Sequence, residues 1–352
     1  MTPAKLRAER LRSHRLTAPA PTVADAASHL LAVQSQEFWG GRWALATRTA
    51  GAPTMRAVDA LFDDGTLIRA WTQRGTLHIV PARDFAWMLR VTGERQQRAQ
   101  APRLRELGLD ADVLARIERA ARAALRGGNA LTRAEFFDVL SGIGVDPTGQ
   151  RGAHAIGDLA IRGIICQGPV VPRPDGVSRE QYFVLVEEHI TDAHVPDDPA
   201  AEMFVRYIDG HGPATAEDFA WWSGLTLTAA RAAAASAAAR LDEVDDGVYV
   251  ARARPRRRAT GEVLALASFE EYYISYADRS HAGTPEAFAA VGPGKNGMVR
   301  PILLADGLIV GTWRQSTALG RHMEHPTAEL LADVRDEGVA AALARYAAFV
   351  TG

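Results

Sequence analysis

Apolar residues recur at helical spacing over most of this chain and alternate over short runs elsewhere, and the two patterns come in a repeating order. Between Thr22 and Val80 the pattern predicts two helices followed by two short strands that meet at Arg74-Gly75. Aromatic residues gather between the two helices. The expected helices cover residues 23–31 and 54–62, and the expected strands cover residues 67–72 and 76–80.

The same order recurs twice further along the chain. Thr132 and Glu135 form a capping box at the start of one of these helices. Three helices followed by a two-stranded wing are typical of a winged helix-turn-helix, so we expect three such motifs in tandem. The second set comprises helices 111–125, 133–140 and 151–162 with strands 164–166 and 182–186; the third comprises helices 200–209, 215–222 and 227–240 with strands 241–244 and 247–250.

After Pro255 the pattern changes to short strands separated by glycine-rich turns, with a terminal helix over residues 326–351 that is interrupted at Gly338. The predicted fold class is α+β: three tandem winged helix-turn-helix motifs and a C-terminal β-rich, barrel-like domain. The corresponding domains are residues 1–100, 101–190, 191–254 and 255–352.

Composition is that of a soluble globular protein, with 352 residues of which 47% are hydrophobic and 23% charged. No apolar run is long enough to span a membrane and no secretory leader is evident, so we expect a cytoplasmic protein without membrane contact. The net charge of −2 excludes a uniformly basic nucleic-acid coat, although local basic patches remain compatible with it. Cys166 is the only cysteine, which excludes an internal disulfide and cysteine-rich metal sites.

Sequence motifs of several enzyme classes are absent. The chain has no HExxH, no GxSxG and no phosphate-binding GxxxxGK[ST], so neither a metal nor a cofactor is expected. Residues 292–297 match GxGxxG but lack the strand-to-helix context of a dinucleotide site.

Two glutamines, Gln34 and Gln36, stand at the end of an apolar helix beside aromatic residues. Residues two apart on a regular helix point about 200° away from each other, so both can face one ligand only where the helix ends or breaks. Taken alone, polar residues at a helix end are more often solvated or capping.

The first hairpin is rich in side chains suited to nucleic acid, namely Trp71, Arg74, Thr76 and His78. Aromatic rings stack on bases and arginine contacts phosphate. The alternative is a core position for Trp71 and a buried, hydrogen-bonded His78.

A basic run after the third wing contains Arg252, Arg254 and Arg256. Phosphate contact is one interpretation of this run. Acidic residues lie just before it, so a locally neutralised, solvated surface is equally compatible with the sequence.

Four long motifs, LAVQSQEFWG, WTQRGTLHIVP, FEEYYISYADRS and VRPILLADGLIVGTWR, resemble the winged-helix DNA glycosylases of the AlkZ/YcaQ type, and more closely the AlkZ-like branch. The resemblance implies hydrolysis of the N-glycosidic bond of N7-alkylguanine in duplex DNA. Its substrates would include bulky adducts and, in one branch, interstrand crosslinks. The family's Gln-aliphatic-Gln signature corresponds to Gln34 and Gln36, with Ser35 departing from the aliphatic residue at its centre.

We therefore expect a monofunctional, monomeric DNA glycosylase without metal or cofactor that acts on double-stranded DNA containing an alkylated purine. Gln34 and Gln36 are the expected catalytic residues. The expected DNA-binding residues are Trp71, Arg74, Thr76, His78, Arg252, Arg254 and Arg256. Two other functions stay open: a winged-helix DNA-binding protein without catalysis, either a regulator or a damage-binding paralogue, and a protein-interaction scaffold.

Overall fold

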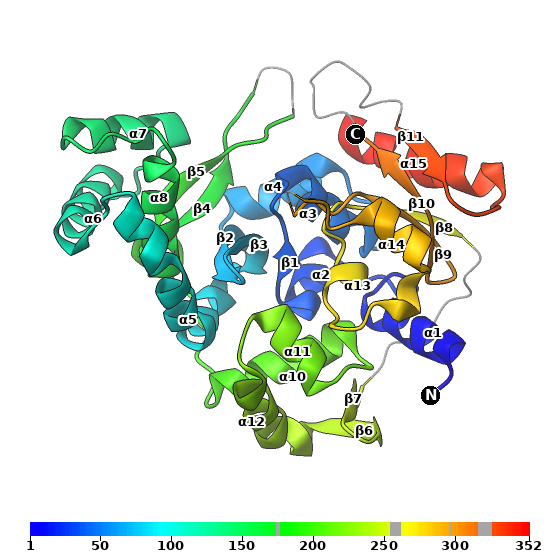
Figure 1. The fold of residues 1–352 in the computed structure, drawn as a ribbon. Helices are drawn as coiled ribbons and strands as arrows, with labels where there is room; N and C mark the ends of the chain where they lie inside the picture. Colours follow the sequence, from blue (N-terminus) through cyan, green and yellow to red (C-terminus); the bar gives the residue numbers. More distant parts are fainter. Residues whose placement is uncertain (174–176, 254–261, 296, 316–325) are drawn as a thin grey trace. The chain divides into compact units, whose positions relative to one another are not determined.

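Most of the predicted helices and strands are present, in the predicted order along the chain. The computed structural model describes residues 1–173, 177–253, 262–295, 297–315 and 326–352. The chain divides into two compact units, of which unit 1 comprises Met1–Asp59 and Ala200–Gly352 and unit 2 comprises Ala60–Pro199 (Figure 1). The first division falls within helix α4 (Met55–Asp63) and the second at the start of helix α10 (Pro199–His211).

Unit 2 contains two hairpins and the helices around them. Helix α7 (Arg133–Gly142) begins at the expected capping box, in which the Thr132 hydroxyl accepts from the backbone N–H of Glu135 and the Glu135 carboxylate accepts from that of Thr132. The helices are η1 (Ala82–Asp84), α5 (Phe85–Glu106), α6 (Ala111–Leu125), α7 (Arg133–Gly142), α8 (Arg151–Ile161) and α9 (Val186–His189), and the strands are β2 (Leu67–Gln73), β3 (Thr76–Pro81), β4 (Ile165–Val170) and β5 (Gln181–Leu185).

The two hairpins of unit 2 join in one antiparallel sheet with the order β3-β2-β4-β5. Arg69 of β2 is opposite Gln167 of β4, and its guanidinium donates to the Gln167 side-chain oxygen at 2.7 Å. The wings of the first and second predicted motifs, β2–β3 and β4–β5, are therefore neighbours in one sheet.

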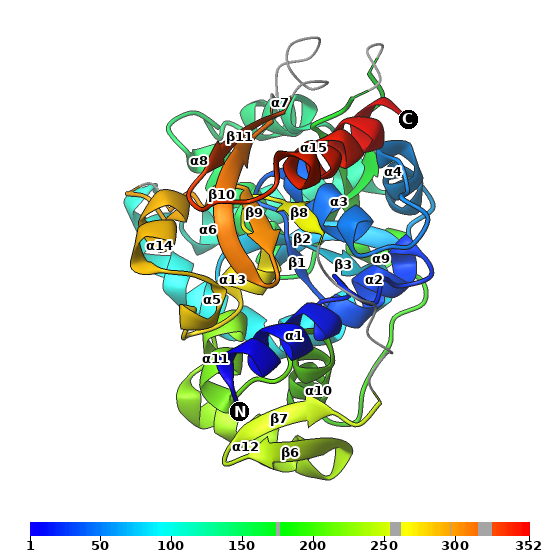
Figure 2. The same ribbon diagram turned by 90° about the vertical axis from the view of Figure 1, so that its right-hand side faces the viewer.

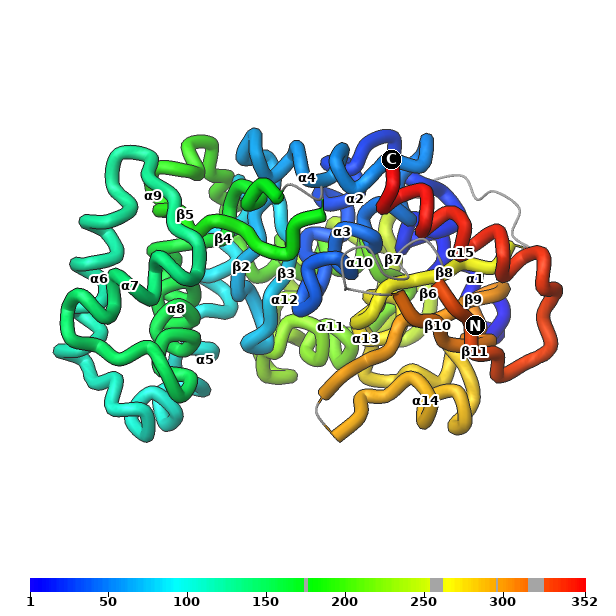
Figure 3. Tube along the Cα trace, turned by 90° about the horizontal axis from the view of Figure 1, so that it is seen from above, coloured from blue at the N-terminus to red at the C-terminus, as the bar shows by residue number. Residues whose placement is uncertain are grey.

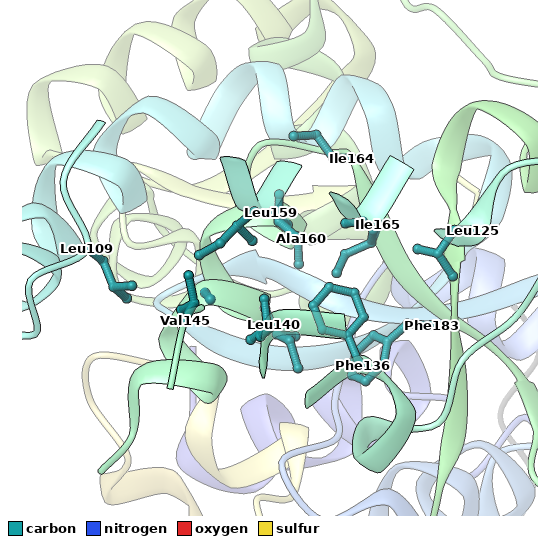
Figure 4. Close-up of a cluster of buried hydrophobic side chains, with 14 of the residues drawn as sticks. Leu109, Leu125, Phe136, Leu140, Val145, Leu159, Ala160, Ile164, Ile165 and Phe183 are labelled. Carbon is teal, nitrogen blue, oxygen red and sulfur yellow. The ribbon is translucent and has the colours of Figure 1, made fainter. Parts of the chain in front are cut away.

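The core of unit 2 lies where α6, α7 and α8 pack on β4 and β5 (Figure 4). Phe136 of α7 and Phe183 of β5 meet edge to face with ring centroids 5.7 Å apart, and both are buried among leucines and isoleucines. Burial of this apolar surface is the main stabilising contribution to the unit. Cys166 is buried in β4, as expected, and burial raises the pKa of its thiol.

Unit 1 combines the N-terminal helices with the whole C-terminal part. Its helices are α1 (Pro3–Ser13), α2 (Val23–Leu30), α3 (Phe38–Thr47), the first residues of α4, most of α10, α11 (Ala216–Ser223), α12 (Leu227–Ala237), η2 (Ala238–Arg240), α13 (Glu271–Ile274), η3 (Ser280–Ala282), α14 (Pro285–Val291) and α15 (Asp336–Thr351). Its strands are β1 (Val33–Gln34), β6 (Leu241–Asp245), β7 (Val248–Ala251), β8 (Val263–Leu266), β9 (Ile302–Ala305), β10 (Leu308–Arg314) and β11 (Thr327–Leu330).

The strands β11, β10, β9 and β8 lie side by side in that order as an antiparallel sheet, and β6 pairs with β7 as a hairpin (Figure 3). Helix α15 packs on β8 and α3 (Figure 2). An aromatic cluster joins these elements, since the ring of Tyr346 in α15 lies 5.3 Å from that of Trp43 and 4.8 Å from that of Trp313. Both indoles donate to carbonyl oxygens at the end of β8, each at 2.8 Å.

Three expectations for the C-terminal part need correction. Residues 327–330 were expected in a helix and instead form β11, because their backbone pairs with β10, with Leu330 opposite Gly311. The helix begins at Asp336 and continues through Gly338 without interruption. The expected barrel-like closure is not seen: the four strands form an open sheet in the described part of the chain.

The fold is thus a mixture of helices and antiparallel sheets. The order of three helices and a hairpin occurs in all three predicted regions, while the assignment of three winged helices and the four domain boundaries stay predictions. Within the described residues no helix is both long and apolar enough to cross a membrane.

Candidate active site

The segment that carries Gln34 and Gln36 begins at a strained turn. Helix α2 starts with a capping box between Thr22 and Asp25 and ends at Leu30. Leu31 then adopts φ 64° and ψ −48°, and the backbone N–H of Ala32 donates to the Leu30 carbonyl oxygen at 2.8 Å. Such a turn is strained for a residue with a side chain, and it redirects the chain from the helix into β1.

The glutamines therefore lie beyond the helix, Gln34 in the short strand β1 and Gln36 in the bend before α3. Gln34 is the second residue of β1 and its side chain is buried, with 7% exposed. Ser35 is completely buried, whereas Gln36 is exposed. The helix end required for both glutamines to face one ligand is present, because α2 ends at Leu30, one residue before the expected end and ahead of both glutamines.

The backbone of Gln34 is held by a buried carboxylate. Its N–H donates to Oε1 of Glu271, in α13, at 2.6 Å. The other oxygen, Oε2, accepts from the Trp222 indole N–H at 3.3 Å and from the Ser275 hydroxyl at 2.5 Å. His211 Nε2 lies 3.6 Å from the same oxygen. Glu271 thereby connects β1 to α10, α11 and α13.

The preceding residue, Glu270, makes a different buried contact. Its carboxylate pairs with Arg48, and both side chains are completely enclosed. The Glu270 Oε1 also accepts from the Tyr272 backbone N–H at 3.1 Å, which caps α13. Phe269, just before it, has φ 54°, so the backbone is strained here as well.

Buried histidines and tyrosines form a cluster next to this pair of carboxylates. His14 Nε2 lies 2.8 Å from the Tyr276 hydroxyl, which in turn donates to the His211 carbonyl oxygen at 2.6 Å. Burial lowers the pKa of His14 well below its ordinary value and raises the pKa of Tyr276 well above its own. At neutral pH His14 and Tyr276 are uncharged, so they support the site as hydrogen-bonding groups.

Arg10 also contacts this cluster of histidines and tyrosines. Its guanidinium is 2.8 Å from Nδ1 of His281 and stacks 3.6 Å above the Tyr276 ring. The same guanidinium is 3.6 Å from the Asp218 carboxylate. Burial lowers the pKa of His281 to about 3, with the charge of Arg10 acting in the same direction.

Glu37 ends the segment and immediately precedes α3. Its carboxylate accepts from the Ser268 hydroxyl at 2.6 Å and from the Trp39 indole N–H at 3.2 Å. These contacts join the start of α3 to the residues that follow β8.

The β2–β3 hairpin of unit 2 turns at two residues with positive φ, Arg74 at 53° and Gly75 at 70°. Positive φ at both positions is typical of a type I′ turn, which matches the twist of the strands. The turn is tied to α5 by Gln96, whose side-chain oxygen accepts from the Gly75 N–H at 3.2 Å and whose amide donates to the Thr72 carbonyl oxygen at 2.9 Å.

The predicted DNA-binding side chains of this hairpin differ in exposure. Arg74 and Thr76 are half-buried, and Trp71 is half-buried against the core of unit 2. His78 is fully buried: its Nδ1 lies 3.0 Å from the Thr76 carbonyl oxygen and its Nε2 lies 3.5 Å from Arg74. The carbonyl only accepts, so Nδ1 carries the proton. DNA contact by these four residues stays a prediction.

Of the predicted basic run, Arg252 is exposed and its guanidinium lies 3.7 Å from the Asp242 carboxylate. Arg254 and Arg256 lie outside the described residues. The acidic neighbour that the alternative interpretation of this run requires is thus present beside Arg252, in the form of Asp242. Among the described residues, no three His, Cys, Asp or Glu side chains gather as a metal site would require.

Comparison with known proteins identifies the family to which this chain belongs. The family model described as DNA glycosylase AlkZ-like matches residues 27–349. The chain belongs to the AlkZ-like DNA glycosylases. A relative from Streptomyces sahachiroi, an interstrand DNA cross-link repair glycosylase, is 24% identical over 313 residues, which are 83% of this chain and 82% of the relative.

The solved structure of the Streptomyces sahachiroi DNA glycosylase AlkZ has the same fold, with a TM-score of 0.78 and 21% identity over 100% of this chain and 98% of that one. Membership in the AlkZ-like family makes this protein a DNA glycosylase, and the prediction of a repair enzyme acting on DNA is confirmed at that level.

In this AlkZ-like glycosylase, Glu271 and its partners are the residues that the sequence analysis missed. Glu271 is separated from Gln34 by 237 positions. The available signal was the motif FEEYYISYADRS, in which a pair of carboxylates stands among aromatic residues. A carboxylate pair is usually solvated, so only burial identifies this one as part of the site.

Proposed function

We propose that this AlkZ-like protein is a monofunctional DNA glycosylase that hydrolyses the N-glycosidic bond of N7-alkylguanine in duplex DNA. Gln34 and Gln36 position the attacking water and the lesion. The observation that carries the proposal is the placement of the two glutamines on an anchored segment between α2 and α3, one buried and one exposed, on either side of the buried Ser35.

The chemistry requires little acid catalysis. Alkylation at N7 makes guanine cationic, so when the bond from C1′ to N9 breaks, the base takes the electron pair and leaves neutral. The sugar develops oxocarbenium character, and a water oxygen forms the new bond to C1′ while its proton passes to solvent. The protein must mainly hold the water and the lesion in place and stabilise developing charge.

Amide side chains suit this task. A glutamine carbonyl oxygen accepts a hydrogen bond from water and orients it, although it is too weak a base to remove the proton early. The exposed Gln36 is accessible to a large DNA ligand, and the enclosed Gln34 has its backbone fixed by Glu271. We assign the two residues jointly to water and lesion.

Simple hydrolysis is favoured over strand cleavage through an amine. A lyase reaction proceeds through a Schiff base, for which lysine is the usual side-chain amine. Of the 40 basic residues only Lys5 and Lys295 are lysines, so the sequence offers few candidates. We therefore expect the products to be free alkylated base and an intact strand with an abasic site.

The β2–β3 hairpin of unit 2 is the proposed DNA contact. Arg74 stands at the tip of a tight turn beside the exposed Gly75, where its guanidinium suits a phosphate. Trp71, Thr76 and His78 would support or extend that contact, and Arg252 with Arg254 and Arg256 would add phosphate contacts. The Streptomyces sahachiroi relative is an interstrand DNA cross-link repair glycosylase, which suggests interstrand crosslinks as a further substrate class.

The test is base release from duplexes that carry N7-methylguanine, a bulky N7 adduct or an N7 crosslink. We expect free base and an abasic site from the wild type. Gln34→Ala and Gln36→Ala should each lower the single-turnover rate by about 10²-fold, the range typical of lost positioning, with DNA affinity changed little.

The matched control is Gln97→Ala, the same exchange at an exposed position of α5, which should leave the rate unchanged. Tight binding to one DNA sequence with no base release from any adduct would favour a regulator instead. Absence of DNA binding at low salt would favour a scaffold.

A further inference from the structure

We infer that Glu271 is a positioning residue of the active site, which holds the backbone of Gln34 and thereby directs its side chain. The inference rests on the catalytic role proposed for Gln34. It assigns a function in the reaction to a carboxylate far from the glutamines in the chain.

The contact is direct and enclosed. Glu271 Oε1 lies 2.6 Å from the backbone nitrogen of Gln34, and the Glu271 side chain is completely buried. Hydrogen bonds to an ionised acceptor are shorter and stronger than neutral ones, and water does not compete at a buried site. A carboxylate on the backbone N–H restrains the orientation of the whole Gln34 residue.

The carboxylate is itself held in one orientation. Its second oxygen accepts from the Trp222 indole at 3.3 Å and from the Ser275 hydroxyl at 2.5 Å. Trp222 lies in α11 and Ser275 directly follows α13, so rotation of the Glu271 side chain would break contacts in two separate segments. A buried carboxylate is costly without such donors, and here each oxygen has at least one.

Gln34 needs this external restraint because of the turn before it. Leu31 has φ 64°, a strained conformation that persists only where surrounding contacts hold it. The bond from Glu271 is attached three residues after that turn, at one of the residues whose position matters for catalysis. A displacement of about 1 Å in a positioned group can lower a rate by about 10²-fold.

The neighbouring Glu270 provides a matched control within the same helix end. Both carboxylates are buried, and they differ in what they bind: Glu270 pairs with Arg48, and Glu271 binds the Gln34 backbone. A general loss of stability should follow from changing either residue. A loss of catalysis in the folded protein should follow only from changing Glu271.

The test uses Glu271→Gln in the full-length protein, with N7-methylguanine duplex as substrate. The amide keeps the shape of the carboxylate but turns an N–H toward either Gln34 or the Trp222 and Ser275 donors, so one side loses its acceptor. We expect a single-turnover rate about 10- to 100-fold lower at saturating enzyme, with the dissociation constant for DNA within about twofold of wild type. Glu270→Gln should lower the unfolding midpoint and leave the rate per folded molecule within about threefold.

A double-mutant comparison separates positioning from other roles. If Glu271 acts through Gln34, adding Glu271→Gln to Gln34→Ala should cause no further loss of the rate above spontaneous depurination. Multiplied losses would overturn the inference, as would an unchanged rate for Glu271→Gln in an enzyme that loses activity with Gln34→Ala. No base release by the wild type would instead overturn the proposed function.

Should Glu271→Gln fail to fold, Ser275→Ala replaces it. This change removes one donor from Oε2 and leaves the bond to Gln34. We expect a loss of about 3- to 10-fold that disappears in the Gln34→Ala background. An unchanged rate would count against the inference.

Discussion

Three non-glycine residues with left-handed backbone lie close to the residues that matter most here: Leu31 before Gln34, Phe269 before Glu271, and Arg74 in the hairpin turn. A side chain at positive φ costs about 1 kcal/mol or more relative to glycine, and such positions cluster at functional sites. At Leu31 and Phe269 the side chains are buried, so packing offsets the strain. At Arg74 the side chain is only half-buried, which suggests that it is retained for contact with a ligand.

Arg74→Asn tests this at the residue scale. Asparagine tolerates positive φ better than arginine, so the hairpin should keep its stability or gain up to about 1 kcal/mol. Removal of one phosphate-binding cation should weaken binding to duplexes of any sequence and reduce the slope of log affinity against log salt by about 1. Urea unfolding and binding titrations between 50 and 200 mM salt measure the two effects. An unchanged salt slope would exclude Arg74 from the phosphate contact.

At the scale of elements, close backbone approach decides where the C-terminal sheet ends. Gly311 of β10 is opposite Leu330 of β11, and a Cβ atom at this glycine would lie 2.7 Å from the Glu329 carbonyl oxygen. The contacted atoms belong to the backbone, so they cannot rotate away. Glycine at position 311 therefore allows the two backbones to approach closely enough for β11 to pair with β10.

Gly311→Ala should therefore separate β11 from β10 and lower the free energy of unfolding by about 1–3 kcal/mol, as overpacking does elsewhere. The control is Gly142→Ala near the end of α7, where a Cβ atom meets nothing within 4 Å. That change should be neutral or stabilise by about 0.5–1 kcal/mol. Urea unfolding followed by circular dichroism distinguishes the two, and equal stability of both variants would show that β11 adapts.

At the scale of the whole molecule, the buried ionisable groups are distributed unevenly. Unit 1 encloses His14 and His281 together with the Arg48–Glu270 pair, and His29 is half-buried. Burial lowers the pKa of His29 to about 4 and of His281 to about 3. In the unfolded chain these groups take a proton near the ordinary value of 6.5, so the unfolded state binds more protons between those values.

Stability should therefore fall as the pH decreases below about 6.5. We expect a lower melting temperature at pH 5 than at pH 7, with about 1–2 kcal/mol lost per histidine whose pKa is lowered in this way. His281→Asn removes one of these groups and should make the decline smaller. Equal melting temperatures at the two pH values would contradict the assignment of neutral buried histidines.

Local sequence signals were reliable wherever local interactions decide the structure. The capping box at Thr132 and the turn at Arg74-Gly75 both occur as predicted. Helix α6 spans residues 111–125, as its periodicity indicates. The sequence did not reveal α3, because its glycines and aromatic residues lack a clear helical pattern.

The sequence by itself determined the order of helices and hairpins, the family and the candidate glutamines, because these depend on short-range periodicity and on motifs that are contiguous in the chain. Only the tertiary structure decided that Gln34 is enclosed while Gln36 is exposed, and that Glu271 holds the Gln34 backbone from 237 positions away. Burial and long-range hydrogen bonding depend on which segments pack together. A carboxylate in a motif therefore shows its role only when the fold has removed it from water and placed a donor beside it.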